Sequence, residues 1–277
     1  MKKIISAITA AAVLCVPALS ASAGNFSNDE PTLYFRAEEQ EGVNILPSGR
    51  VYINTSAVND DIELKAGAYC YDPEKAIGLI FVKWQSEDKN IALTGLTDPI
   101  TAAGKCPFSK WTEPEKINIS SREADNFMAV SYSSLISEPF ALSGENSDDY
   151  PLACFTAKVS KDSPVGIYSV DFITEGDNKC SIAYCDPIKE IIPSGDHARS
   201  LDIAVSDLEL GDANSSGKIE ATDASKVLVA YASINAGEES GLTPAEEIAA
   251  DLTGDGMIAA NDASLILVKY ADLSAAK

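Results

Sequence analysis

The C-terminal region contains one sequence written twice, DANSSGKIEATDASKVLVAYA at residues 212–232 and DLTGDGMIAANDASLILVKYA at residues 251–271. The two copies begin 39 residues apart, and 11 of their 21 aligned positions are identical. Repetition at this density indicates that one structural unit occurs twice. The repeated unit therefore decides the fold of the last quarter of the chain.

The first half of each copy has the spacing of an EF-hand calcium loop. Oxygen-bearing residues recur at the first, third, fifth and twelfth positions, with glycine at the sixth and a backbone carbonyl available at the seventh. A hard cation takes about six to eight oxygen ligands, and glycine makes the sharp turn without steric cost. The predicted ligands are Asp212, Asn214, Ser216, the Lys218 carbonyl and Asp223 in the first loop, and Asp251, Thr253, Asp255, the Met257 carbonyl and Asp262 in the second.

These loops predict two calcium ions. We expect the second ion to be held less tightly, because Thr253 is a weaker ligand than Asn or Asp and Ala259 offers no side chain at the ninth position. The alternative interpretation is that Asp, Asn, Ser and Gly only mark polar turns. The identical register of the two loops, each followed by the same apolar pattern, favours the calcium sites.

A helix is predicted after each loop, because apolar residues recur there at helical spacing. The predicted stripes are Ala224, Val227, Leu228 and Tyr231, and Ala263, Ile266, Leu267 and Tyr270. Between the copies, Thr243-Pro244-Ala245-Glu246 has the pattern of a capping box, which predicts a short helix over residues 244–250. The residues before Asp212 are too few to form the entering helix of an ordinary EF-hand.

The duplicated loop–helix unit, with Asp as the last ligand, resembles a type I dockerin, the calcium-dependent module that attaches proteins to cohesin modules of a cellulosome. The resemblance implies that residues just before the last ligand, and about one turn into the following helix, contact the cohesin. The implied partner-binding residues are Ala221, Thr222, Leu228 and Val229 in one copy, and Ala260, Asn261, Leu267 and Val268 in the other. The pairs Ala221-Thr222 and Ala260-Asn261 differ from the Ser-Thr pair common in this family. For Leu228 and Leu267, packing in the domain core is an alternative to partner contact.

The first 23 residues have the pattern of a signal peptide. Lys2 and Lys3 precede an apolar segment at residues 4–19, and Ala21-Ser22-Ala23 forms a small-residue cleavage site. The sequence therefore predicts a secreted, extracellular protein whose mature chain begins near Gly24.

Composition excludes several classes of function. The formal net charge of −21 disfavours nucleic acid and anionic membranes as partners. A single histidine argues against a histidine-based catalytic triad or zinc site. Five cysteines remain once Cys15 is removed with the signal peptide, and an odd number leaves at least one thiol free or in an intermolecular bond. Cys180 and Cys185 are candidates for a small loop, whereas Cys154 is predicted to be a core residue.

Residues 24–207 predict an all-β domain of about nine short strands, a sandwich or jelly roll that precedes the small all-α domain at residues 208–277. The predicted strands are 33–36, 50–54, 62–71, 77–84, 117–120, 127–132, 152–159, 166–173 and 201–205. Tyr168, Val170 and Phe172 alternate with polar residues, which indicates one buried face.

The stretches PLACFTAKV at 151–159, GIYSVDF at 166–172 and YDP at 71–73 are similar to strands of the cohesin family. This resemblance implies a nine-stranded jelly roll that binds dockerins through one sheet face.

Together, the two resemblances imply a non-catalytic adaptor scaffoldin of a polysaccharide-degrading cellulosome. It would receive another subunit's dockerin on the sandwich and dock into a scaffoldin cohesin through its C-terminal domain. A carbohydrate-binding module is the alternative, with candidate stacking residues Trp84, Trp111, Tyr132, Tyr150 and Tyr184. A β-sandwich hydrolase is a third possibility, with candidate carboxylates Glu113, Glu115, Glu138, Asp148 and Asp149.

Overall fold

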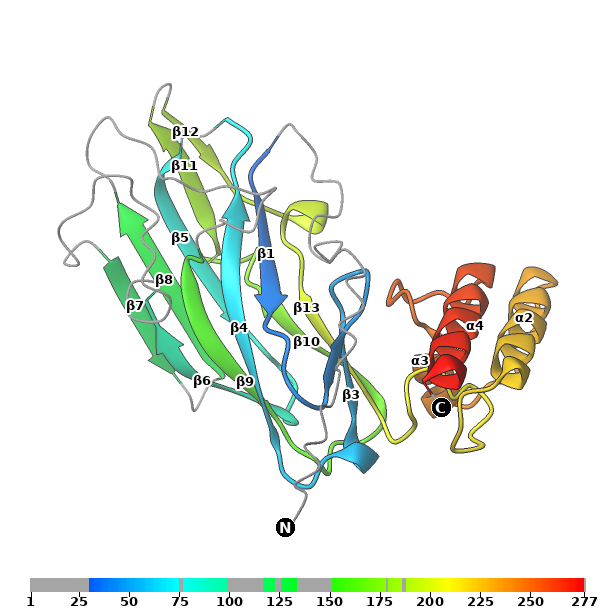
Figure 1. Cartoon of the computed structure of the whole chain (residues 1–277). Coiled ribbons are helices and arrows are strands. Elements are labelled where there is room, and N and C mark those ends of the chain that lie inside the picture. The colour runs from blue at the N-terminus through cyan, green and yellow to red at the C-terminus, as the bar shows by residue number, and fades with distance from the viewer. Residues whose placement is uncertain are drawn as a thin grey trace, which may run out of the picture.

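The computed structural model describes residues 30–74, 77–98, 117–122, 126–133, 151–177, 179–185 and 188–276. The predicted signal peptide lies outside these residues. Figure 1 shows a β-sandwich followed by a small domain of three helices, which lies beside one end of the sandwich. No helix in the described residues is long and apolar enough to cross a membrane.

The sandwich is built from thirteen strands and two 3-10 turns within the described residues. The strands are β1 Thr32–Ala37, β2 Val43–Ile45, β3 Val51–Asn54, β4 Ile62–Tyr71, β5 Ile77–Gln85, β6 Ile91–Thr97, β7 Ile117–Arg122, β8 Phe127–Ser133, β9 Ala153–Val159, β10 Gly166–Phe172, β11 Ser181–Cys185, β12 Ile188–Ile191 and β13 Leu201–Ser206. The turns are η1 Thr55–Ala57 and η4 Gly195–His197.

The strands form two sheets that face each other across one core (Figure 1). One sheet has the order β1-β4-β9-β6. The other has the order β12-β11-β5-β10-β13-β3-β2, and β8 pairs with both β5 and β7. All pairings between these strands are antiparallel except that of β3 with β13, which is parallel.

Aromatic rings fill the centre of the sandwich. Phe35 stacks on Phe172 with ring centroids 4.1 Å apart, and Phe155 meets Phe35 edge to face. Trp84 is fully buried beside both Phe35 and Phe155. The predicted buried face of β10 is confirmed, because Tyr168, Val170 and Phe172 all lie in this core.

All nine predicted strands are present, and β9 is central, paired with β4 and β6. Four strands were not predicted, namely β2, β6, β11 and β12. Three of them are five residues or shorter, and β6 carries Gly95 at a bulge, so each lacks a long run of strand-forming residues.

The helical domain consists of α2 Ala221–Asn235, α3 Pro244–Ala250 and α4 Ala260–Ala275. The helix predicted at residues 244–250 is confirmed, and its capping box forms between Thr243 and Glu246. In the described residues, no helix enters the first loop from β13, as expected from the short connection. α2 and α4 lie side by side (Figure 1).

Only part of each predicted apolar stripe is buried. Ala224 and Val227 of α2, like Ala263 and Ile266 of α4, pack in a core that also contains Leu46, Tyr52 and Ala204 of the sandwich. Leu228 and Leu267 are 46% and 45% exposed, so the alternative interpretation, in which they pack in this core, is wrong. The stripe is narrower than predicted because two short helices cover only one side of each other.

Candidate functional site

The first loop is organised around the carboxylate of Asp212, the residue at its first position. Its Oδ1 accepts a hydrogen bond of 2.9 Å from the Ser216 amide, and its Oδ2 accepts one of 2.8 Å from the Gly217 amide. The side chains of Asn214 and Ser216 bond within the loop, to the Ser216 amide and to the Lys218 carbonyl. The loop thus brings Asp212, Asn214, Ser216 and Lys218 close together in space.

Asp223 joins this loop to α2. Its Oδ1 accepts from the Asn214 amide at 3.0 Å, and its Oδ2 accepts from the Glu220 amide at 2.7 Å. A carboxylate in this position also stabilises the helix, whose N-terminus carries partial positive charge. The residue is fully buried, and burial and then the nearby Asp212 raise the pKa of its carboxyl group, against the lowering effect of the two amides.

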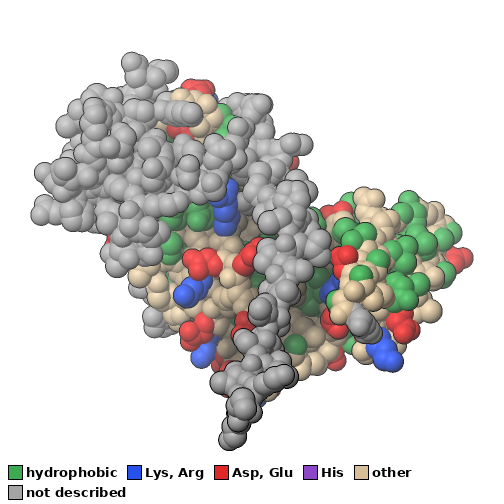
Figure 2. Space-filling model, viewed as in Figure 1, with side chains coloured by type: hydrophobic (Ala, Val, Ile, Leu, Met, Phe, Trp, Pro, Cys, Tyr) green, Lys and Arg blue, Asp and Glu red, His purple; other side chains and the backbone are tan. Residues whose placement is uncertain are grey.

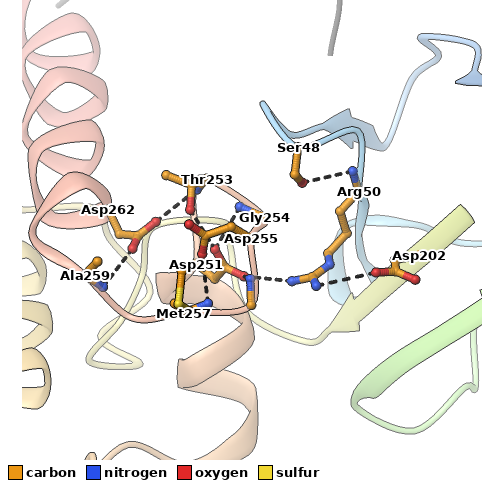
Figure 3. Close-up of polar contacts among 11 residues, drawn as sticks. Ser48, Arg50, Asp202, Asp251, Thr253, Gly254, Asp255, Met257, Ala259 and Asp262 are labelled. Carbon is orange, nitrogen blue, oxygen red and sulfur yellow. Dashed lines mark hydrogen bonds and ion pairs between the residues drawn. The ribbon is translucent and has the colours of Figure 1, made fainter. Parts of the chain in front are cut away.

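The second loop repeats this arrangement (Figure 3). Asp251 Oδ1 accepts from the Gly254 amide and from Thr253 Oγ1, and its Oδ2 accepts from the Gly256 amide. Asp262 is fully buried and accepts from the amides of Thr253 and Ala259, both at 2.9 Å. Burial and the charge of Asp251 raise the pKa of the Asp262 carboxyl group.

Both sixth-position glycines have the left-handed backbone that the loop pattern requires, with φ of 77° at Gly217 and 83° at Gly256. In each loop, two buried carboxylates, at the first and twelfth positions, also lie close enough to raise the pKa of one of them. Buried like charges are costly unless a cation compensates them, so the donor set fits a divalent ion bound by oxygen.

Not all of the predicted ligands are buried inside their loop. Asp255 is exposed and its Oδ1 accepts from the Met257 amide. No group of three or more His, Cys, Asp or Glu side chains close enough to hold a metal occurs in the described residues. The loops therefore rely on two buried carboxylates each, with amide, hydroxyl and carbonyl oxygens as the remaining candidates.

All eight partner-binding residues implied by the dockerin resemblance lie on the surface. They are Ala221, Thr222, Leu228 and Val229 on α2, and Ala260, Asn261, Leu267 and Val268 on α4. Among the large apolar members, Val229 and Val268 are the most exposed, at 66% and 58%. Figure 2 shows hydrophobic side chains gathered on the exposed surface of the helical domain.

This surface is larger than the sequence suggested. Tyr231 and Ile234 on α2, and the equivalent Tyr270 and Leu273 on α4, are 38–43% exposed. Tyr231 and Tyr270 are 39 positions apart in the sequence, as are Ile234 and Leu273. This repeated spacing is the sequence signal that could have identified the larger surface. The two helices therefore present nearly the same apolar pattern twice.

Two polar contacts of the second loop have no counterpart in the first loop within the part of the chain that the structure describes. The Ser48 amide donates to the Thr253 carbonyl at 3.0 Å, and Arg50 Nη1 lies 2.7 Å from Asp251 Oδ2 (Figure 3). Ser48 and Arg50 lie in the connection between the antiparallel strands β2 and β3, and Gly254 lies against the same connection, because a Cβ atom there would stand 2.8 Å from the Cβ of Leu46. The sandwich thus packs directly on the second loop, which no local sequence pattern indicated.

The first loop contacts α3 instead. Glu246 forms a 2.7 Å ion pair with Lys226 and accepts a hydrogen bond of 2.9 Å from Ser215 Oγ. The Thr243 amide donates to its other oxygen. Burial raises the pKa of Glu246, but these partners outweigh burial and lower it to about 2.

The stacking residues of the carbohydrate-binding hypothesis are not on the surface where the structure describes them. Trp84, Tyr132 and Tyr184 are 0%, 1% and 4% exposed, so they cannot form a sugar platform. The other candidate aromatics, Trp111 and Tyr150, lie outside the described residues. The same is true of the carboxylates considered for a hydrolase, Glu113, Glu115, Glu138, Asp148 and Asp149.

The cysteine predictions are partly wrong. Cys70, Cys154 and Cys180 are free thiols, so Cys180 does not close a loop with Cys185. The Cys180 Sγ instead exchanges hydrogen bonds with the backbone of Lys83. Cys154 is only partly buried, because it faces away from the core on β9.

Comparison with known structures gives low similarities. The chain is 17% identical to a type I cohesin–dockerin complex from Clostridium thermocellum, over 63% of this chain and 99% of that chain, with a TM-score of 0.38. It is 11% identical to a type III cohesin module of a cell-surface anchoring scaffoldin from Ruminococcus flavefaciens, over 66% and 93%, with a TM-score of 0.39. These values do not by themselves assign the sandwich to a family. No curated protein matches the chain.

The C-terminal domain gives a match at the level of a family. Residues 210–270 match the model of the dockerin type I domain. This segment contains both loops, all of α2 and α3, and most of α4. The duplicated loop–helix units described above thus coincide with the match to the dockerin type I domain.

Proposed function

We propose that this chain is a non-catalytic adaptor of an extracellular, polysaccharide-degrading cellulosome. Its C-terminal domain docks into a scaffoldin cohesin in a calcium-dependent manner, and its sandwich receives the dockerin of another subunit. The observation that carries the docking role is the repeated apolar surface of α2 and α4, which is exposed at equivalent positions of both copies.

An exposed apolar surface of this kind is typical of a protein–protein interface. Leu228, Val229 and Tyr231 project from α2, and Leu267, Val268 and Tyr270 repeat them on α4. Because the two sets are nearly equivalent, the same partner surface fits the domain in either of two orientations. The pairs Ala221-Thr222 and Ala260-Asn261 differ, and this difference favours one orientation.

Calcium is the ion that the two loops are proposed to hold. Asp212, Asn214, Ser216, Lys218 and Asp223 would bind one ion, and Asp251, Thr253, Asp255, Met257 and Asp262 the other. Each ion supplies positive charge that compensates buried carboxylates and so favours the folded loop. Asp223 and Asp262 transmit this effect, since each also caps the helix that carries the partner-binding residues.

Binding of purified type I cohesins to the full chain, measured by calorimetry with calcium or with a chelator, tests the docking role. Leu228→Asp and Leu267→Asp should each retain binding through the other copy, whereas the double variant should lose about 30-fold or more in affinity. Chelation should abolish binding and lower the thermal midpoint of the helical domain. Ile192→Asp, at an exposed apolar residue of the sandwich, is the matched control. Full binding by the double variant would contradict the proposal.

The double variant also tests the sandwich. With its own docking helices silenced, any remaining affinity of the full chain for dockerins of the same secretome must come from the sandwich. We expect at least one such dockerin to bind. If none binds, and cohesin binding by the unmodified chain is intact, the adaptor role is excluded while the docking role stands.

A further inference from the structure

The two loops differ in one respect that their sequences do not show, which is the positive charge that faces the first-position carboxylate. In the second loop, Arg50 Nη1 lies 2.7 Å from Asp251 Oδ2 (Figure 3). Arg50 Nη2 lies 3.6 Å from Oδ2 of Asp202, the second residue of β13. The Arg50 side chain is only 11% exposed. Asp251 is 7% exposed and Asp202 is 40% exposed, so the pair with Asp251 is the largely buried one, and such a pair interacts more strongly than an exposed ion pair does.

Among the residues that the structure describes, the first loop has no such partner. Asp212 accepts hydrogen bonds from the amides of Ser216 and Gly217. Across the described ranges, no Lys, Arg or His forms an ion pair with Asp212 or Asp223. The same carboxylate is therefore compensated by a side chain of the sandwich in one loop and by backbone amides alone in the other.

We propose that Arg50 acts as an internal cation for the second loop, with which the second calcium ion must compete. This inference rests on the proposed calcium function. A calcium ion bound through the Asp251 carboxylate would lie close to the guanidinium, and the two cations repel each other. The two loops therefore fill in order, the first at lower calcium concentration than the second.

The competition is reciprocal, as coupling between two binding events must be. Calcium in the second loop weakens the contact between Arg50 and Asp251, and it thereby loosens the sandwich from the helical domain. At low calcium concentration, the ion pair and the hydrogen bond from the Ser48 amide to the Thr253 carbonyl hold the second loop against the sandwich. Arg50 thus links the calcium concentration to the rigidity of the connection between the two domains.

The weak second ligands, Thr253 and Ala259, also predict unequal sites, so the test must isolate Arg50. Calcium affinities are measured by calorimetry on the full chain, starting from chelator-treated protein, for the unmodified chain, Arg50→Gln, Arg50→Lys and Lys158→Gln. Lys158 lies on β9 in an exposed ion pair with Asp61, so Lys158→Gln controls for the change in net charge. An Asp262→Asn background, which removes the negative charge of a second-site ligand and so weakens calcium binding there, identifies the site that responds.

We expect Arg50→Gln to raise the affinity of the second site about tenfold or more, and to leave the first site unchanged. Arg50→Lys and Lys158→Gln should leave both sites unchanged, and the effect should vanish in the Asp262→Asn background. Hydrogen exchange at the Ser48 amide, an independent readout, should speed up when the second site of the unmodified chain fills. If the calcium affinity of the second site is unchanged or lowered in Arg50→Gln, the inference about Arg50 is overturned while the proposed calcium function stands. Absence of calcium binding in every variant would overturn the proposed calcium function and this inference with it.

Discussion

Gly254 and Ser215 occupy the fourth position of the two loops, and both have a left-handed backbone, with φ of 73° and 58°. Ser215 uses its hydroxyl to bond Glu246 of α3. A side chain at Gly254 would instead collide with Ser48 and Leu46 of the sandwich. The two loops therefore have different residues at this position because the first loop packs on α3 and the second packs on the sandwich.

Gly254→Ala should destabilise the calcium-free protein by about 1–3 kcal/mol, because it adds both backbone strain and a collision with the sandwich. The measurement is chemical unfolding in the presence of chelator. Gly237→Ala is the matched control, since Gly237 has φ of 80° but no heavy atom within 4 Å of an added Cβ. Equal losses in the two variants would mean that the contact between Gly254 and the sandwich contributes nothing.

Glu246 makes stability depend on pH. Its folded-state pKa of about 2 lies below the ordinary value, so the stability it contributes is present above pH ~4.5 and is lost as the pH falls towards 2. The unfolding free energies of the unmodified chain and Glu246→Gln, measured in chelator from pH 6 to pH 2, should therefore converge as the pH falls. Glu238→Gln, in the exposed turn after α2, is the control. A difference that stays constant over this range would show that the ion pair with Lys226 does not set the effect.

At the scale of the element, the third residue of α2 and of α4 is also the last residue of a loop, and it has two tasks. Asp223 and Asp262 each accept the amide of the residue that precedes their helix, Glu220 or Ala259, and each also accepts the amide of the loop's third residue. The end of the loop and the start of the helix are therefore fixed by the same carboxylate. Folding of the loop and of the helix that follows it must be cooperative.

Asp262→Ala should therefore lose helix and metal affinity together. Loss of the cap costs about 1–2 kcal/mol in unfolding free energy even without calcium. Circular dichroism in chelator measures the first effect, and calcium calorimetry measures the second. Asp272→Ala, near the exposed C-terminus of α4, removes an equal charge away from the loop and should change neither quantity. If Asp262→Ala lost calcium affinity but no stability in chelator, its role as a cap would be contradicted.

The elements that depend on local patterns were predicted well. The loop spacing, the capping box at Thr243 and the alternation in β10 all involve residues close in sequence. The contact of Arg50 with Asp251 joins residues 201 positions apart, and nothing near either residue indicates it. β2, β11 and β12 form because neighbouring strands offer edges to pair with, so their short sequences alone could not predict them. The sequence likewise did not decide whether Leu228 and Leu267 are exposed. Helical spacing places them next to the buried stripe of their helix, but it does not fix how wide that stripe is.

At the scale of the whole molecule, the two domains share a core. Tyr52 and Ala204 of the sandwich pack with Leu210, Val227 and Ile266 of the helical domain. Tyr52 is fully buried and donates a hydrogen bond of 2.8 Å to the Leu208 carbonyl, in the segment that joins the domains. Burial raises the pKa of its hydroxyl group far above the ordinary value, so it remains a donor over the whole physiological range.

Tyr52→Phe should loosen this connection while leaving the sandwich intact. It removes one hydrogen bond, which typically contributes about 1 kcal/mol, and leaves the Leu208 carbonyl to be satisfied by water. Hydrogen exchange at residues 207–211 should increase in this variant, while exchange in β4 and β9 stays unchanged. Tyr168→Phe, whose hydroxyl bonds the Pro164 carbonyl within the sandwich, is the matched control. Unchanged exchange at residues 207–211 would show that the shared apolar core alone holds the connection.

The placement of β13 has a mechanical consequence. This strand pairs with β10 on one edge and β3 on the other, and the first loop begins six residues after its last position. A pull on the helical domain is therefore transmitted along β13, and it loads the hydrogen bonds to both neighbouring strands in shear, so that they must break together. The helical domain is thus tethered to a strand that is held by hydrogen bonds on both of its edges.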